Sequence, residues 1–146
     1  MDSSSPSDAA AGRVLHLAEA EAWRRGQQCG AYTGSTRGAD LADVGYVHMS
    51  TAAQLPAVIA FLYADVAPDE LVLLVVDLAT LAAAGVEVRW EALEGAGSAF
   101  PHAYGAVPVA AVVAALDLAT DDAGRLALPD LAGLHVLGSV DGPAGA

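Results

Sequence analysis

The stretch ELVLLVVDL (Glu70–Leu78) decides the fold of this chain. Its apolar residues run without alternation, and strands of this kind are buried on both faces at the centre of a sheet. We therefore expect a central strand here, with other elements covering both of its faces. The run stops at Asp77, well short of the roughly 18 apolar residues that a membrane-spanning helix needs, so no membrane contact is predicted.

Further strands are expected on both sides of this run. Upstream, Arg13–Leu17 and Gly45–Met49 have the alternating pattern of short strands. Downstream, Gly85–Leu93 alternates strictly, which is typical of a half-buried strand. Its two faces differ in polarity, with Val86, Val88 and Trp90 on one and Glu87, Arg89 and Glu91 on the other.

Helices and loops fill the intervals between these strands. Glu19–Gly26 contains helix formers closed by a glycine, whereas the Gly, Ser and Thr of Gln27–Ala39 predict a loop. A helix is expected at Ala52–Tyr63, because Thr51 and Gln54 have the spacing of a capping box.

The segments after the alternating strand are less regular. Phe100–Gly105 is predicted to form a compact aromatic turn. Val107–Leu118 is predicted to form a helical turn at Pro108 and then a last strand. Together these patterns indicate the α+β class.

The 146 residues are enough for one domain with one core. We expect a disordered N-terminal tail at residues 1–12, because these are Ser, Asp, Pro and Ala without a signal-peptide pattern. A single α+β domain follows at 13–118. Residues 119–146 contain Pro129, Gly133 and Gly138, and they predict a loosely packed C-terminal extension.

The net charge limits the classes of possible partner, and the cysteine content bears on the cellular setting. The formal net charge of −12 repels phosphate backbones, which argues against DNA or RNA as a partner. Cys29 is the single cysteine, so no intramolecular disulfide forms, and a reduced, cytoplasmic setting fits.

Imidazole, hydroxyl and carboxyl groups give the candidate site. His16, His48 and His102 lie in strand or turn positions, and each alone is more often a structural histidine than a catalytic one. His48 stands shortly before Ser50 and Thr51, at a predicted helix start that attracts anions. The alternative for these residues is a capped helix without a ligand.

Glu91 has two readings. Beside Trp90 it is a carboxylate against a flat apolar wall, suited to a general base or to binding a hydroxyl. Paired with Arg89, it is a solvated edge glutamate. A zinc site from the three histidines lacks any diagnostic spacing, so no metal is predicted.

These residues also carry a family resemblance. The strings GYVHMST (Gly45–Thr51) and FPHAYG (Phe100–Gly105), with His16 and Arg89–Glu91 in the same order, resemble a family of small, mostly bacterial proteins catalogued as domain of unknown function 952. The resemblance covers about Arg13–Leu118. It implies a small split mixed or antiparallel sheet with flanking helices, similar to the ADP-ribosyltransferase fold, whose crevice holds NAD in the enzymes.

The resemblance also implies roles. His16 matches the residue that binds the adenosine-side ribose, Ser50 and Thr51 match the nicotinamide pocket, and Glu91 is the candidate carboxylate that steadies the ribose cation. The full set of expected catalytic residues is Glu91, His48 and His102. The expected ligand-binding residues are His16, Ser50, Thr51, Gln54, Arg89 and Tyr104.

Three hypotheses about function remain open at this stage. The first is an NAD-type nucleotide pocket that supports ADP-ribosyl transfer or NAD glycohydrolysis, with NAD as candidate substrate and no other cofactor indicated. The second is a non-enzymatic module that binds a small molecule or a partner in the same crevice. In the third, the polar residues only tie loops to the sheet.

Overall fold

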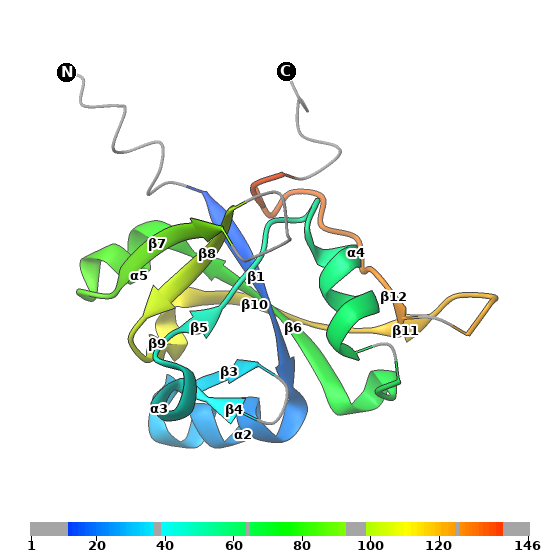
Figure 1. Cartoon of the computed structure of the whole chain (residues 1–146), viewed down its shortest axis with the longest axis horizontal. Coiled ribbons are helices and arrows are strands. Elements are labelled where there is room, and N and C mark those ends of the chain that lie inside the picture. Colours follow the sequence, from blue (N-terminus) through cyan, green and yellow to red (C-terminus); the bar gives the residue numbers. More distant parts are fainter. Residues whose placement is uncertain (1–11, 37–38, 64, 93–98, 125, 139–146) are drawn as a thin grey trace.

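The computed structural model describes residues 12–36, 39–63, 65–92, 99–124 and 126–138. The predicted central strand is β6 (Leu71–Asp77), which lies between β1 (Arg13–Glu19) and β10 (Val112–Asp117) in a three-stranded antiparallel sheet (Figure 1). The six apolar residues of β6 are all buried. The predictions of a central strand and of the α+β class are confirmed.

A second antiparallel sheet carries most of the polar candidates. Its order is β5 (Val47–His48), β8 (Ala99–Tyr104) and β7 (Glu87–Ala92). An isolated bridge connects it to the first sheet, with Leu15 and Ser50 exchanging two backbone hydrogen bonds of 2.8 Å. Apart from this bridge, β1 and β5 do not pair within the described residues, so the chain has two antiparallel sheets.

The prediction of an aromatic turn at Phe100–Gly105 is wrong, because this segment forms β8, the middle strand of the second sheet. Phe100, His102 and Tyr104 alternate with smaller residues, which is the two-residue period of a strand. Pro101 has no N–H to donate, and its carbonyl instead accepts from Met49 N at 2.9 Å.

The first helix and the following segment also differ from expectation. Helix α2 (Ala20–Cys29) contains the buried Gly26. Gly30 caps its C-terminus with a φ of 89°, a conformation that glycine adopts readily. The predicted loop at Gln27–Ala39 contains three short strands, which pair with β9 or with each other. They are β2 (Ala31–Tyr32), β3 (Gly34–Thr36) and β4 (Ala39–Asp40).

The remaining elements are short. The helical ones are α3 (Leu41–Val44), α4 (Leu55–Val58), the π-helical η1 (Ile59–Tyr63), the 3₁₀ turns η2 (Pro68–Glu70) and η3 (Val109–Ala111), and α5 (Leu78–Ala83). The strands are β9 (Val107–Pro108), β11 (Ala119–Thr120) and β12 (Leu126–Ala127). The turn at Pro108 followed by a strand is therefore confirmed.

The start of the helix predicted at Ala52–Tyr63 is held by the expected capping box. Thr51 N donates to Gln54 Oε1 at 3.0 Å, and Gln54 N donates to Thr51 Oγ1 at 3.3 Å. Regular α-helix begins only at Leu55 and widens into the π-helical turn η1 at Ile59. The helix was thus placed correctly, but its geometry was not predicted.

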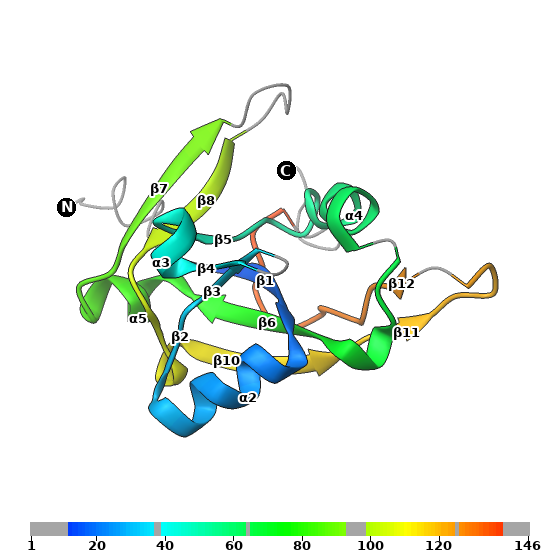
Figure 2. The same cartoon turned by 60° about the horizontal axis from the view of Figure 1, so that its bottom comes forward.

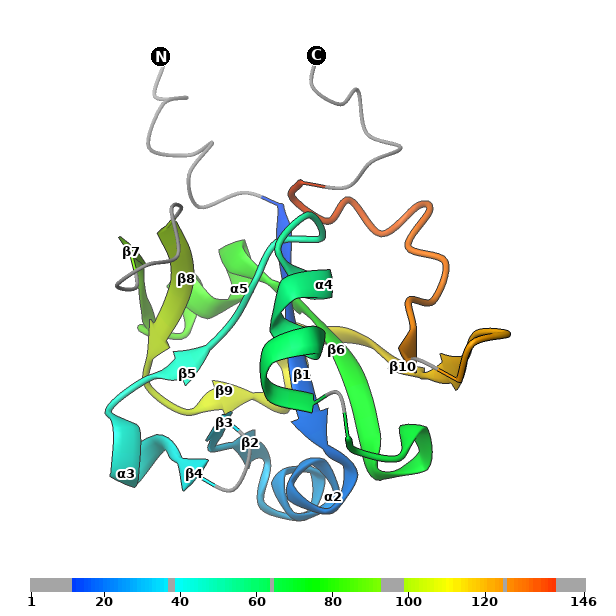
Figure 3. The same ribbon diagram turned by 45° about the vertical axis from the view of Figure 1, so that its right-hand side comes forward.

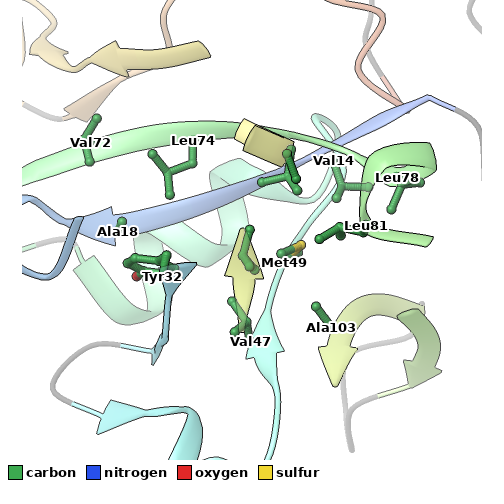
Figure 4. Packing of buried hydrophobic residues seen from close by; sticks show 13 residues of the cluster. Val14, Ala18, Tyr32, Val47, Met49, Val72, Leu74, Leu78, Leu81 and Ala103 are labelled. Atoms are coloured by element: carbon green, nitrogen blue, oxygen red, sulfur yellow. The ribbon is translucent and has the colours of Figure 1, made fainter. Parts of the chain in front are cut away.

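Apolar clusters cover both faces of the first sheet. On one face, Val14, Leu74 and their neighbours pack against Val47 and Ala103 of the second sheet and against α5 (Figure 4). On the other face, Leu15 and its neighbours pack against α4 and η1, which lie in front of β1 in Figure 3. Burial of apolar surface on both faces is the main stabilising contribution.

The alternating strand Gly85–Leu93 is only partly as predicted. Val86 and Val88 pack against the core, but Trp90 is 39 % exposed. Trp90 shares their face, but it is two residues from the C-terminal end of β7. That end of the strand points away from α2 (Figure 2).

The range predicted as a C-terminal extension makes specific contacts where it is described. Arg13 and Val136 form a parallel bridge, and Leu137 bonds through its backbone to Arg13 and Ala52. Val136 is 5 % exposed within the cluster that packs β1 against α4 and η1. The predicted N-terminal tail lies outside the described residues, apart from Gly12. Within the described segments, no helix has the length and apolar character to cross a membrane.

Candidate functional site

His16 lies at the middle of β1, and both of its ring nitrogens bond to the protein. Nδ1 is 2.6 Å from the His48 carbonyl oxygen, and Nε2 is 2.8 Å from Tyr32 Oη. Because a carbonyl oxygen only accepts, Nδ1 carries the proton, and Nε2 accepts from the Tyr32 hydroxyl. Burial lowers the pKa of His16 to about 4, so the ring is neutral at physiological pH.

A pocket of about 560 Å³ opens beside this pair. This volume falls within the range of small-molecule sites. The pocket is walled by β1, α2, the β2–β4 segment, α3 and η1. Its lining includes the polar or ionisable side chains of His16, Glu19, Arg25, Tyr32, Asp43 and Tyr63.

Burial in the wall of the pocket determines the protonation state of Tyr32. Burial raises the pKa of Tyr32 well above its usual value, and the charges of Tyr63 and Glu19 add to the shift. Tyr32 therefore stays protonated and keeps its bond to His16. Gly34 provides the space, since a Cβ there would lie 2.2 Å from Tyr32 Oη.

His48 lies on β5 of the second sheet, and its backbone carbonyl accepts from His16 of the pocket. It lines a cavity of about 10 Å³ together with His16, Ser35, Ser50 and Tyr63, about the size of one water molecule. Burial, and then the charge of His102, lower the pKa of His48 to about 4. Its ring centroid is 5.2 Å from that of His102.

Glu91 collects two hydrogen bonds on one carboxylate oxygen. Oε1 accepts from Tyr104 Oη at 2.6 Å and from His102 Nδ1 at 2.8 Å. The bonds from Tyr104 and His102 hold the pKa of Glu91 below its usual value, so the carboxylate is ionised. The Glu91 side chain is 37 % exposed, so this oriented carboxylate reaches solvent.

His102 is buried beneath this carboxylate. It is 1 % exposed, and the Tyr46 ring stacks on it with centroids 4.0 Å apart. Its Nε2 has no hydrogen-bond partner among the described residues.

Arg89 forms an ion pair with Glu87 rather than with Glu91. Its Nε is 3.0 Å from Glu87 Oε2, and its guanidinium lies 4.4 Å above the Tyr104 ring. The reading of Glu91 as an edge glutamate in an ion pair with Arg89 is therefore wrong. The carboxylate turns instead to His102 and Tyr104 on the neighbouring strand.

The expected ligand-binding residues at the helix start are engaged within the protein. Thr51 and Gln54 form the capping box, and Gln54 Nε2 also donates to the Ala99 carbonyl at 2.7 Å. Ser50 is 2 % exposed and joins the two sheets through its backbone. Among the described residues, no three His, Cys, Asp or Glu side chains are grouped to hold a metal ion.

The predicted residues thus form two adjoining groups. His16 belongs to the pocket, and Glu91, His102, Tyr104 and Arg89 lie on the second sheet, with His48 between the groups. Glu91 does not line the pocket. Sequence reasoning missed Tyr63 and the role of Tyr32. Gly34, two residues after Tyr32, could have indicated that the Tyr32 ring packs closely against the chain. No local sequence pattern indicated Tyr63.

Comparison with known proteins places this arrangement in a family. The model of the family described as "Protein of unknown function (DUF952)" matches residues 17–115. No curated protein matches the chain at a significant level.

Solved structures of one bacterial protein are similar throughout the domain. The crystal structure of protein CC0527 from Caulobacter crescentus has 32 % identity and a TM-score of 0.66, covering 80 % of this chain and 94 % of that one. The solution NMR structure of CC0527 has 28 % identity and a TM-score of 0.62, covering 82 % of this chain and 92 % of that one. The chain therefore belongs to the DUF952 family of proteins of unknown function.

Proposed function

We propose that this protein binds a small molecule of the nucleotide type in the pocket beside His16 and Tyr32, with NAD as the candidate ligand. The position of the pocket carries the proposal. The two sheets are joined at Leu15 and Ser50, and His16 is the first residue of β1 beyond that joint. In the ADP-ribosyltransferase fold that the sequence motifs resemble, NAD occupies the crevice of a split sheet; this support is by analogy of fold.

The lining chemistry supports binding of a ligand with hydroxyl groups. Tyr32 and Tyr63 form a buried part of the wall, 2 % and 3 % exposed, and Glu19 and Asp43 contribute carboxylates, which accept from hydroxyl groups. The protein binds this ligand without catalysing a reaction on it. His16, with its lowered pKa, is a weak base, and Tyr32, with its raised pKa, is a weak acid. The net charge of −12 favours a small molecule over nucleic acid as the partner.

A thermal-shift series with NAD, ADP-ribose, nicotinamide and adenosine tests the proposal. A ligand that binds only the folded protein raises its melting temperature with concentration. Cys29→Trp, at an exposed position that lines the pocket, should abolish the shift. Gln28→Trp, at the neighbouring exposed position outside the pocket, should preserve it. No shift with any of the four compounds would overturn the proposal.

A second candidate function is ADP-ribosyl transfer or NAD glycohydrolysis, and the oriented Glu91 carboxylate favours it. In glycohydrolysis the bond between ribose C1′ and the nicotinamide nitrogen breaks, and its electron pair leaves with nicotinamide. A water oxygen then bonds to C1′ and loses a proton to solvent. Glu91, ionised and held by Tyr104 and His102, lies outside the pocket, so this second function requires the nicotinamide riboside end of NAD to extend past His48 to the second sheet. There Glu91 would accept from a ribose hydroxyl and stabilise the positive ribose.

Nicotinamide release from NAD measures this second function. Glu91→Gln should abolish release while leaving NAD binding in place. Glu87→Gln changes a carboxylate on the same face of β7 that pairs with Arg89, so it should leave release unchanged. Binding of NAD without release by the unaltered protein would leave the binding function and exclude the enzymatic one.

A further inference from the structure

Strand β7 forms an open edge of the second sheet. Within the described residues it pairs with β8 alone, from Glu87 opposite Tyr104 to Ala92 opposite Ala99, and this pairing has no bulge (Figure 2). An edge strand of this regularity presents a row of backbone N–H and C=O groups on its unpaired side. The geometry of β7 therefore allows a further antiparallel strand to be added.

The other edges of the two sheets are less suited to pairing. The edge strand β10 has a register irregularity next to Val112, and such bulges obstruct the addition of a strand. On the outer side of β1, isolated bridges to Ser50 and Val136 occupy part of the edge. The remaining edge strand, β5, is only two residues long. Among the described strands of these two sheets, β7 offers the longest regular edge.

The side chains of β7 restrict which strand can pair with it. Glu87, Arg89 and Glu91 share one face, and their side chains are 61 %, 51 % and 37 % exposed. On the other face, the large aromatic side chain of Trp90 is 39 % exposed. Directly opposite side chains of paired strands are about 5 Å apart, so a suitable partner alternates charge on one face and carries an apolar residue on the other. A second copy of β7 has this pattern.

Charge selects one register for two antiparallel copies of β7. Directly opposite residues lie on the same face of a sheet, so a two-fold axis passes between a residue and its own copy. With the axis at Arg89, two arginines meet and Glu87 lies opposite Glu91. With the axis at Trp90, two tryptophans meet and Arg89 lies opposite Glu91 on both sides of the axis. Both arrangements pair the same length of strand, so charge decides in favour of Trp90.

The hydrogen bonds within each copy leave room for these ion pairs. Arg89 uses Nε and Nη2 to bond to Glu87 at 3.0 and 3.1 Å, and further guanidinium N–H groups remain for a second carboxylate. Tyr104 and His102 both bond to Oε1 of Glu91, so Oε2 can accept from the arginine of the other copy.

The net charge of −12 opposes association of two copies mainly at long range. At physiological salt the Debye length is about 8 Å, so repulsion between distant exposed charges is largely screened. Cross-strand neighbours are about 5 Å apart, which lies within that length. The attraction between opposite charges on the two β7 strands is therefore kept.

We infer that two copies of this chain associate through β7, with antiparallel strands related by a two-fold axis at Trp90. The two second sheets then form one continuous sheet, and each Trp90 is covered by its copy. Two pairs between Arg89 and Glu91 fix the register. This association is independent of the ligand proposed for the pocket beside His16.

Cross-linking through introduced cysteines tests the position of the axis. In a Cys29→Ser background, which removes the exposed native thiol, Trp90→Cys places two thiols at directly opposite positions, within the Cα separation of about 4.4–6.8 Å that a disulfide spans. Oxidised glutathione should then convert the full chain into a covalent dimer. Glu87→Cys places its thiols about 20 Å apart in this register, so this variant should stay monomeric.

Exchange of charges tests the ion pairs. Arg89→Glu sets acidic side chains opposite each other, and Glu91→Arg sets basic ones opposite each other. In sedimentation, each variant alone should dimerise at least about tenfold more weakly than the unaltered chain. A mixture of the two variants restores opposite charges and should form the mixed dimer. Arg24→Glu, at an exposed position on α2, makes the same change in net charge and should leave dimerisation unchanged.

Several results would overturn this association. One is sedimentation of the unaltered chain as a monomer up to about 1 mM, where even weak dimers form. Another is dimerisation of Arg89→Glu as tight as that of the unaltered chain. A third is cross-linking of Glu87→Cys or Arg89→Cys as readily as that of Trp90→Cys, because the axis would then lie elsewhere. If Glu91→Arg does not fold, the cross-linking yield of Trp90→Cys with and without Arg89→Glu decides whether the ion pairs form.

Discussion

Glu91 and His102 form a carboxylate–imidazole pair across two neighbouring strands, with Glu91 Oε1 2.8 Å from His102 Nδ1. The pair joins an ionised, half-exposed acid to an imidazole that is 1 % exposed. Tyr104 donates to the same oxygen at 2.6 Å. We therefore expect this carboxylate to stabilise the second sheet locally, whether or not a ligand contacts it.

Glu91→Gln should lower thermal stability even without ligand. The amide oxygen is a weaker acceptor than the carboxylate for His102 and Tyr104, and we expect the melting temperature to fall by about 5 °C. Glu87→Gln, at an exposed position on the same strand, should lower it by less than a third of that. Equal effects of the two substitutions in differential scanning calorimetry would contradict the assigned role.

Gly34→Ala should destabilise the protein by about 2 kcal/mol. The new Cβ would lie 2.2 Å from Tyr32 Oη and 2.6 Å from Cζ, so the ring must move and its bond to His16 must break. Gly105→Ala is the matched control, because its nearest contact would be an ordinary 3.5 Å to Val86. Denaturant unfolding compares the two variants, and similar midpoints would refute the close approach of Tyr32.

Stability should fall as the pH is lowered from about 6.5 to about 4, because burial lowers the pKa of His16 and of His48 from the ordinary value of 6.5 to about 4 in the folded protein. Both pKa values are lowered in the folded state, so the unfolded chain binds more protons across this window. Each histidine then contributes a slope of at most about 1.4 kcal/mol per pH unit. Asp77 and Glu91 have lowered pKa values too, from 3.8 and 4.5, so they add to the loss mainly below the histidine window.

Substitution of one histidine isolates this effect. His48→Gln should reduce the slope of unfolding free energy against pH by about half over the upper part of that window. Urea unfolding at several pH values measures the slope. An unchanged slope would mean that His48 titrates alike in the folded and unfolded chains.

Val136→Ala should cost about 2 kcal/mol of unfolding free energy. Val136 lies in the range predicted as a loose extension, and it is 5 % exposed in the cluster that packs β1 against α4 and η1. Val113→Ala, at a position 42 % exposed on β10, loses the same atoms and should cost less than about 0.5 kcal/mol. A negligible effect at Val136 would show that the segment contributes little packing.

Local patterns predicted the parts of the fold that local interactions decide. The unbroken apolar run of β6 required cover on both faces, and the spacing of Thr51 and Gln54 required a capping box. The alternation within Phe100–Gly105 was also visible, yet Pro101 and the aromatic residues suggested a turn. Pairing with β5 and β7 decided that segment, and no local pattern reports pairing between strands.

The candidate site was predicted as a set of residues but not as an arrangement. Residue types and motif order singled out His16, His48, Glu91, His102 and Tyr104. Their partners depend on sheet register, which brings Arg89 opposite His102 and turns Glu91 toward His102 and Tyr104. The π-helical turn that ends at Tyr63 carries a further pocket residue that no pattern indicated.

By itself, the sequence determined the class of fold, the central strand, the acidic character and the residue types available for chemistry, because periodicity, composition and formal charge are properties of the chain alone. Only the tertiary structure decided that His16 is a neutral acceptor for Tyr32 and that Glu91 is an ionised acceptor for His102 and Tyr104. Protonation state and hydrogen-bond direction depend on burial and on neighbours from distant segments, and folding alone supplies both.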